Sequence, residues 1–181
     1  MLIRPLGRAA AVVLALAVVH DGTVALAQRP VRTPDVMFTP TRHAIADAML
    51  QLAGVGAGDV VYDLGSGDGR IPIIAAQKYG ARGIGIEIDP ALVALARSNA
   101  ADAQVTHRVA FSVGDLFTAD LSEATVVTMY LSPNVLKQLE PRLRSLKPGT
   151  RIVSHQFPMG RWAPDRREVV DEAEILLWIV P

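Results

Sequence analysis

Uninterrupted apolar runs alternate with amphipathic stretches along most of the chain. Runs rich in β-branched residues predict strands, and those without regular polar alternation predict strands buried on both faces. The predicted strands cover residues 59–64, 83–88, 108–113, 124–131, 150–157, 167–171 and 174–180. Apolar residues at helical spacing predict helices over residues 41–52, 71–79, 90–100 and 135–146.

Local signals mark where the helices begin and bend. Thr41 is a candidate N-cap for the first helix, and Asp89 followed by Pro90 is a candidate N-cap with proline at the first helical position. Pro72 falls in the permissive first turn of the second helix. Pro141 lies inside the last predicted helix, where we expect a kink.

The order of these elements indicates the fold class. Strands that alternate with helices form right-handed crossovers, which build a parallel sheet covered on both faces. We therefore predict an α/β fold with a mostly parallel seven-stranded sheet and helices on both faces. Such sheets bind ligands at the carboxyl ends of their strands, so the residues that follow each strand are the candidates for function.

The first 27 residues follow a different pattern from the rest. Arg4 and Arg8 precede an apolar run over residues 9–19, and Ala25-Leu26-Ala27 resembles a small-residue cleavage site. We expect residues 1–27 to be an export signal, residues 28–40 an extended arm and residues 41–181 the folded domain. The protein would then be periplasmic or otherwise exported, with no membrane span in the mature chain. The alternative is an uncleaved anchor, although the apolar run is shorter than the roughly 20 residues that span a bilayer.

Composition narrows the classes of partner. Lys and Arg together number 18, as do Asp and Glu, so the chain lacks the overall positive charge typical of nucleic-acid-binding proteins. We expect no nucleic-acid partner. The chain has no Cys, which excludes a disulfide or cysteine-metal scaffold, and we predict no metal site.

A glycine turn follows the first predicted strand. The sequence DLGSGDGR over residues 63–70 brings backbone close to a ligand at Gly65 and Gly67, and the following helix points unpaired N–H groups at the same place. Its spacing is G-x-G-x-G, and not the G-x-G-x-x-G of dinucleotide sites. Asp63 and Asp68 would repel a pyrophosphate but accept hydrogen bonds from an ammonium group. This favours an amino-acid head group over NAD.

The next two strands end in residues suited to a nucleoside. Glu87 stands where doubly wound folds place an acid that accepts hydrogen bonds from ribose hydroxyls. Asp115 could accept from an exocyclic amine, while Leu116 packs against an aromatic base. In this order, the three strand ends predict a site for S-adenosylmethionine.

These motifs resemble a known family. YDLGSGDGRI, GIGIEIDP and VGDLF are similar to successive motifs of class I S-adenosylmethionine-dependent methyltransferases, which have a Rossmann-like fold. FTPT, YLSPN and RIVSHQFPMGRW resemble a bacterial, often exported group related to the ATP synthase c-subunit lysine methyltransferase type. The resemblance implies roles at the methionine part, the ribose and the adenine of the cofactor for Asp63, Gly65, Ser66, Gly67, Gly69, Glu87, Asp115 and Leu116. Asp68 is a further cofactor-binding candidate because of its charge. The chain departs from the family pattern between the fifth and sixth strands, where residues 159–167 leave little room for a helix.

The methyl acceptor is the open question. Tyr130, Asn134 and His155 leave the fourth and fifth strands and are candidate catalytic residues, with His155 able to take a proton near neutral pH. A packed aromatic at 130 and a strand-end hydrogen bond at 155 are the structural alternatives. The resemblance suggests a protein lysine amine as acceptor, and a small molecule or a non-catalytic nucleoside-binding module are alternatives. Phe38 and Trp162 are candidates for a lid, or for anchoring their loops.

Overall fold

The structure is a computed structural model that describes residues 38–181. The predicted export signal and most of the predicted arm lie outside the described residues. The strands are β1 Val60–Leu64, β2 Arg82–Glu87, β3 Val109–Val113, β4 Val126–Met129, β5 Arg151–His155, β6 Arg166–Val170 and β7 Ala173–Ile179. The helices are α1 His43–Leu52, α2 Arg70–Tyr79, α3 Pro90–Asp102 and α4 Pro133–Arg144.

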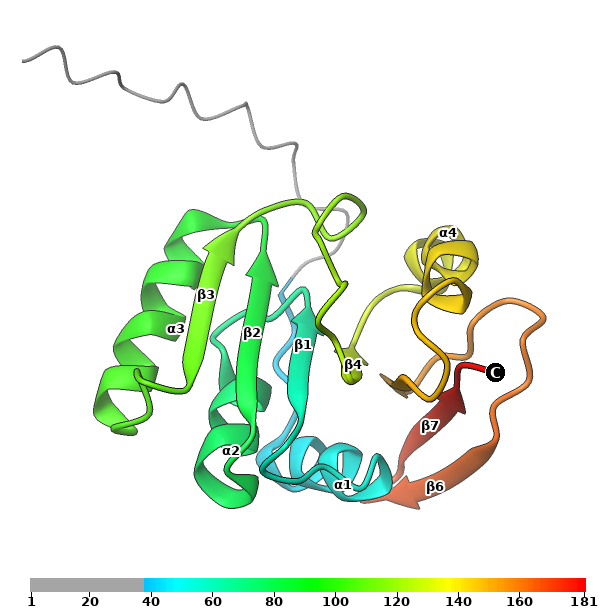
Figure 1. Ribbon diagram of the computed structural model, residues 1–181, viewed down its shortest axis with the longest axis horizontal. Coiled ribbons are helices and arrows are strands. Elements are labelled where there is room, and N and C mark those ends of the chain that lie inside the picture. The colour runs from blue at the N-terminus through cyan, green and yellow to red at the C-terminus, as the bar shows by residue number, and fades with distance from the viewer. Residues whose placement is uncertain (1–37) are drawn as a thin grey trace, which may run out of the picture.

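The seven strands form one sheet in the order β3-β2-β1-β4-β5-β7-β6 (Figure 1). The first five strands pair in parallel, and β7 lies antiparallel between β5 and β6. The order reverses at β1, from which the chain continues outward to β2 on one side and, later, to β4 on the other. The predicted mostly parallel α/β sheet is thereby confirmed, and its switch point lies beside the glycine turn.

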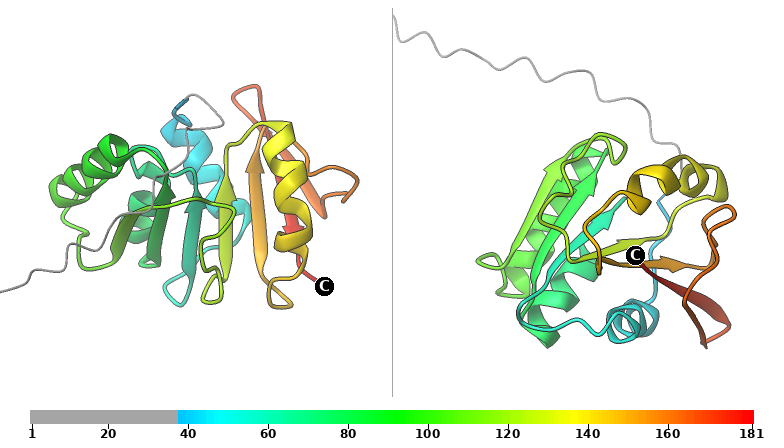
Figure 2. Two further views of the ribbon diagram at one scale, coloured as in Figure 1. Left: turned by 90° about the horizontal axis from the view of Figure 1, so that it is seen from above. Right: turned by 45° about the vertical axis from the view of Figure 1, so that its right-hand side comes forward.

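Helices cover both faces of the sheet (Figure 2). On one face, α1, α2 and α3 pack against the strands through apolar side chains that include Leu50, Ile74 and Val93. On the other face, α4 buries Leu136 and Leu139 in a second core. Consecutive residues of the central strands alternate between these cores, which explains why their sequences are apolar without interruption.

The two faces can be followed along β4. Val126 belongs to the core under α1 and α2, whereas Val127 and Met129 belong to the core under α4. None of the three exposes any of its surface. The sheet is therefore fully enclosed at its centre, so a site has to lie at the ends of its strands or at its edges.

The predicted elements are all present, with ends shifted by a few residues, and two local predictions can be assessed. Asp89 caps α3 as predicted, accepting a hydrogen bond from the Ala91 N–H. The predicted N-cap of the first helix is wrong: Arg42 occupies that position, and the Thr41 hydroxyl instead lies 3.1 Å from Nδ1 of His155. The buried His155 ring engages the Thr41 hydroxyl, which is therefore not available to cap the helix. The helix α4 continues through Pro141.

A loop replaces the helix that the family usually has between β5 and β6. Residues 156–165 contain no helix, as the short sequence there predicted. The loop is fixed from beneath, because Nε1 of the fully buried Trp178 donates to the Trp162 carbonyl at 2.9 Å. Within residues 38–181, no helix combines the length and apolar character needed to cross a membrane.

Candidate active site

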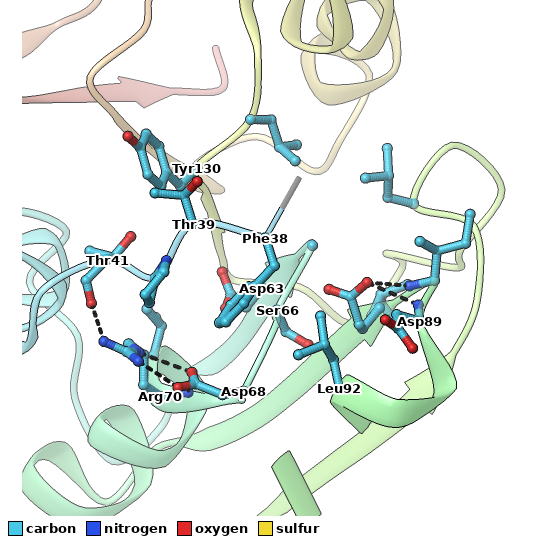
Figure 3. A pocket seen from close by; sticks show the side chains of 18 of the residues that line it. Phe38, Thr39, Thr41, Asp63, Ser66, Asp68, Arg70, Asp89, Leu92 and Tyr130 are labelled. Carbon is cyan, nitrogen blue, oxygen red and sulfur yellow. Dashed lines mark hydrogen bonds and ion pairs between the residues drawn. The ribbon is translucent and has the colours of Figure 1, made fainter. Parts of the chain in front are cut away.

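A cavity of about 200 Å³ lies at the carboxyl ends of the parallel strands (Figure 3). Its walls come from the ends of β1 to β4, from the start of α3 and from residues 38–42, which we call the strap. Most predicted cofactor residues line this first cavity, namely Asp63, Gly65, Ser66, Asp68, Glu87, Asp115 and Leu116. The carboxyl ends of parallel strands meet at one edge of the sheet. Residues that are more than 50 positions apart in sequence therefore lie around one cavity.

Backbone conformation explains the three glycines of the turn. Gly65, Gly67 and Gly69 have φ values of 75°, 53° and 79°, a region that residues with a Cβ rarely adopt. A Cβ on Gly67 would also lie 2.1 Å from Cε2 of Phe38, whose ring rests on the turn. Gly69 is restricted from the other side, because its added Cβ would approach Phe111 to 2.6 Å. Gly69 therefore serves helix packing, and it does not line the cavity.

Glu87 ties the glycine turn to the end of β2. Its Oε2 accepts from the Gly67 N–H at 2.9 Å, and its Oε1 accepts from the Ile88 and Asp89 N–H groups at 2.8 and 3.0 Å. The side chain is buried, yet it still lines the cavity. Glu87 therefore holds the turn in shape and has one acceptor site left, on Oε2, for a ligand.

Two carboxyl groups near the turn have different electrostatic environments. Burial raises the pKa of Asp63 to about 7, with Glu87 and Asp68 adding to the effect and a hydrogen bond from Thr128 opposing it. Burial also acts on Asp68, but hydrogen bonds from Arg70 and its charge outweigh burial, so the pKa of Asp68 is lowered. Asp68 is therefore ionised at neutral pH, while Asp63 is poised to gain or lose a proton.

Arg70 connects the glycine turn to the strap. Its guanidinium pairs with the Asp68 carboxylate at 2.5 Å, and its Nη1 donates to the Thr41 carbonyl at 2.7 Å (Figure 3). Phe38 points from the same strap into the cavity (Figure 3). Sequence reasoning missed the contact of Arg70 with Thr41, because nothing in the local pattern relates position 70 to position 41.

The end of β3 is held by α4. Asp115 accepts from the Phe117 N–H at 2.9 Å, and Arg142 donates to the carbonyls of Leu116 and Ala119. One carboxylate oxygen of Asp115 makes this contact, so the other can face a ligand. Arg142 was not predicted as part of the site, since in sequence it reads as one of several basic residues on a solvated helix.

A second cavity adjoins the first one on the far side of the strap. Thr39, Pro40 and Tyr130 line both cavities, and His155 lines the second. The rings of Tyr130 and His155 pack with centroids 4.0 Å apart. Burial, followed by the charge of Arg42, lowers the pKa of His155. The predicted pair of Tyr130 and His155 is therefore brought together beside the first cavity.

Asn134 is placed differently from the other candidate catalytic residues. It is exposed in the first turn of α4 and lines neither cavity. The structure does not bring it to Tyr130 and His155, so a catalytic role for Asn134 stays a prediction without geometric support. Trp162 likewise lies away from both cavities, packed against Trp178 with ring centroids 6.2 Å apart.

Comparison with known proteins identifies the family. The family model of the ANTKMT methyltransferase domain matches residues 63–166, more than half of the chain. The chain belongs to this family. A protein-lysine N-methyltransferase from Saccharolobus islandicus (strain REY15A) is 44% identical over 139 residues, which cover 76% of this chain and 85% of that protein. The ATP synthase c-subunit lysine N-methyltransferase from Xenopus laevis is 35% identical, covering 84% of this chain and 66% of that protein.

Solved structures agree with the family. The crystal structure of an RNA methyltransferase from Salinibacter ruber, in complex with S-adenosyl-L-homocysteine, is 56% identical with a TM-score of 0.78. The match covers 79% of this chain and 94% of that chain. This ANTKMT-domain protein is thus a class I S-adenosylmethionine-dependent methyltransferase, as the sequence motifs predicted. That it belongs to an exported bacterial group stays a prediction.

The first cavity of this methyltransferase fits the cofactor on structural grounds. Gly65 lines the cavity with backbone alone, whereas the Phe38 ring occupies the space over Gly67, which does not line the cavity. Ser66 Oγ is buried without a hydrogen-bond partner among residues 38–181. An orphaned buried hydroxyl is costly in a finished structure, so it marks a place where a ligand atom completes the hydrogen bonding. Carboxylates at the ends of β1, β2 and β3 supply acceptors for an ammonium group, ribose hydroxyls and an exocyclic amine.

Proposed function

We propose that this protein is an S-adenosylmethionine-dependent protein-lysine N-methyltransferase. The observation that carries the proposal is the 44% identity to the protein-lysine N-methyltransferase of Saccharolobus islandicus over 76% of this chain. The geometry agrees with an amine acceptor, because an aromatic ring and an imidazole stand side by side next to the donor cavity. A lysine amine needs both a site that orients it and a group that removes its proton.

Each part of the first cavity has a proposed role toward the cofactor. Asp63, Asp68 and the glycine turn would hold the amino-acid end, Glu87 the ribose, and Asp115 with Leu116 the adenine. When bound, the cofactor supplies an electrophilic methyl group on a sulfonium. The protein then contributes alignment and the exclusion of water, which account for most of the rate in such a displacement.

His155 and Tyr130 are the proposed acceptor-side residues. The lowered pKa of His155 keeps its imidazole neutral at pH 7, which is the form that accepts a proton from a lysine ammonium group. Thr41 fixes the ring through its contact with Nδ1. Tyr130 lines both cavities and would guide the amine from one to the other.

An RNA acceptor is the second candidate, because a 56% identical relative is described as an RNA methyltransferase. Methyl-labelled cofactor incubated with the protein and a cell extract would separate the two. We expect the label in protein and, after acid hydrolysis, in methyl-lysine. Label in RNA or in a small molecule would overturn the lysine proposal, and a Glu87→Ala variant controls for background transfer.

We also propose that the protein is exported, on the strength of the sequence pattern of residues 1–27. Fractionation of the source cells, followed by N-terminal sequencing of the purified protein, tests it. We expect a mature protein that begins after Ala27. A full-length chain in the cytosolic fraction would contradict export, and a full-length chain in the membrane fraction would favour an uncleaved anchor.

A further inference from the structure

The second cavity has a composition that the donor site does not explain. It has a volume of about 250 Å³, and it is open to solvent on the side of α1 and the β6–β7 turn. Its inner wall is aromatic, with Tyr130 and His155, whereas its outer rim carries the carboxylates of Asp171 and Glu172. An open cavity with an aromatic inner wall and acidic groups at its rim, beside Arg42, suits a lysine side chain from a basic segment. The alkyl stem would pack on the rings, and neighbouring cations of the segment would pair with the carboxylates.

His155 points to a ligand in this cavity. The residue is only 6% exposed, and its Nδ1 is already engaged by Thr41 Oγ1. Its other ring nitrogen, Nε2, has no hydrogen-bond partner among residues 38–181, and the ring lines the cavity. Ser66 Oγ is the one buried, unpaired side-chain atom among the described residues, so Nε2 of His155 is reachable from the open cavity and can accept from a polar group that enters it.

The sheet topology places the acidic rim at the functional edge. Because β7 runs antiparallel to β5, the β6–β7 turn lies at the same edge as the carboxyl end of β5. Arg42 contacts Asp171, with its Nη1 3.7 Å from Oδ2, but Glu172 has no ion pair or hydrogen bond among the described residues. Glu172 is therefore a carboxylate available to an incoming cation.

We propose that the second cavity is the acceptor pocket, and that Glu172 and Asp171 at the β6–β7 turn select a basic polypeptide segment. This inference rests on the proposed lysine methyltransferase function and adds the means of substrate recognition. The lysine side chain would pass between the turn and the strap toward Tyr130, where the two cavities adjoin. The same carboxylates would repel the phosphates of RNA, so the rim also discriminates between the two acceptor classes.

The turn itself offers a variant that does not damage the fold. Asp171 and Glu172 both have positive φ, at 48° and 68°, which glycine adopts at lower cost than glutamate. Glu172→Gly therefore removes the carboxylate while easing the backbone. Glu168 is the matched control, since it is a carboxylate on the adjacent strand β6 that pairs with Arg166 and lines neither cavity.

The test measures binding of a fluorescently labelled short peptide, with a central lysine flanked by arginines, to the protein saturated with S-adenosylhomocysteine. We expect Glu172→Gly to weaken peptide binding about threefold to tenfold, and Glu168→Gln to leave it unchanged. Added salt should reduce the difference. Calorimetry of the cofactor product should give the same affinity for all three proteins.

Three results would overturn the inference: no peptide binding by the wild type, equal binding by wild type and Glu172→Gly, or stronger binding of an RNA oligonucleotide than of the peptide. A failure here is distinct from failure of the proposed function. If extract proteins acquire methyl-lysine and Glu172→Gly methylates them as the wild type does, only the acidic rim is wrong. If methyl-lysine never forms, the proposed function itself is wrong.

Discussion

At the scale of single residues, the site depends on a few side chains that each perform two tasks. Glu87 braces the glycine turn through three backbone N–H groups and also lines the donor cavity. Asp63 is buried in the sheet beside Thr128 and also borders the cavity. Substitutions at these positions should therefore change both the stability of the fold and the binding of the cofactor. For Asp63 the two effects depend on pH in opposite directions, so measurements at several pH values separate them.

Asp63 should make stability fall as pH rises. Its pKa is raised from 3.8 to about 7 in the folded state, so between these values the folded protein binds more protons than the unfolded chain. The contribution of Asp63 to stability is then full below about pH 4 and is lost as pH rises to about 7. Asp63→Asn should remove this decline and raise the free energy of unfolding at pH 8 by up to about 4 kcal/mol. Urea denaturation of both proteins at several pH values measures the free energy of unfolding.

Asp63→Asn should also weaken binding of the cofactor. A cationic ligand favours the ionised form of Asp63, so wild-type affinity should increase as pH rises through about 7, with release of a proton. Asp63→Asn should bind about tenfold more weakly at pH 8 and lose this pH dependence. Calorimetry in buffers of different ionisation enthalpy would detect the proton. A pH-independent wild type would contradict this role.

Glu87→Ala should weaken S-adenosylmethionine binding by about 1–3 kcal/mol, through loss of charge-assisted hydrogen bonds. It also leaves the Gly67, Ile88 and Asp89 N–H groups without their partner, so thermal stability should fall as well. Glu87→Gln retains one acceptor oxygen, so its cofactor affinity and thermal stability should lie between those of the wild type and Glu87→Ala. An unchanged affinity in Glu87→Ala would remove this residue from the cofactor site.

His155→Asn should separate positioning from proton transfer. The shorter side chain keeps a polar group near Thr41 but lacks the atom equivalent to Nε2. We expect kcat to fall by about 10²-fold, with cofactor affinity unchanged. Because the pKa of His155 is lowered, the acidic limb of the wild-type pH profile should lie below pH 6.5 and disappear in the variant. A profile that keeps this limb would rule out His155 as the base.

At the scale of elements, helices and loops hold the strand ends in place. The strap is fixed by Arg70 from α2 and by His155 from β5, and α4 holds the loop after β3 through Arg142. The strap and the loop after β3 are therefore parts of the site that have no regular structure of their own. Their order depends on side-chain contacts from the rigid elements beneath them.

Arg142→Ala should loosen the loop that carries Asp115 and Leu116. The variant loses the hydrogen bonds to the Leu116 and Ala119 carbonyls, so we expect cofactor affinity to fall about threefold to tenfold. Arg144→Ala, on the same helix, is the control, because Arg144 pairs with Glu140 at 3.6 Å and lines neither cavity. Similar affinities in both variants would mean that the loop keeps its shape without α4.

At the scale of the whole molecule, the second face of the sheet is unusually dependent on large side chains. Among the described residues only α4 covers this face as a helix, and the remaining area is closed by loops and by Trp178, Met159 and Leu121. Trp178→Ala should lower the free energy of unfolding by about 3–5 kcal/mol. Denaturant titration measures it, and cofactor affinity at low temperature should be preserved because Trp178 lies outside the donor cavity.

The elements and the donor site could largely be predicted from sequence because their signals are local. Periodicity marked every strand and helix, and the motifs around Gly65, Glu87 and Asp115 identified residues that the structure gathers around one cavity. The Thr41 cap was predicted wrongly, since the competing partner His155 is 114 positions away. Asn134 was expected in the loop after the fourth strand, but it lies in the first turn of α4 and lines neither cavity, which depends on where α4 begins and docks.

The sequence by itself determined which backbone conformations form and which strand ends carry ligand chemistry. Backbone preferences and burial patterns act over a few residues, so they can be recognised without knowing which distant residues each segment contacts. Only the tertiary structure decided that the strap crosses the glycine turn, and that Asp171 and Glu172 reach the same cavity as His155. Those relations depend on the antiparallel insertion of β7 between β5 and β6, and strand order is a property of the whole sheet.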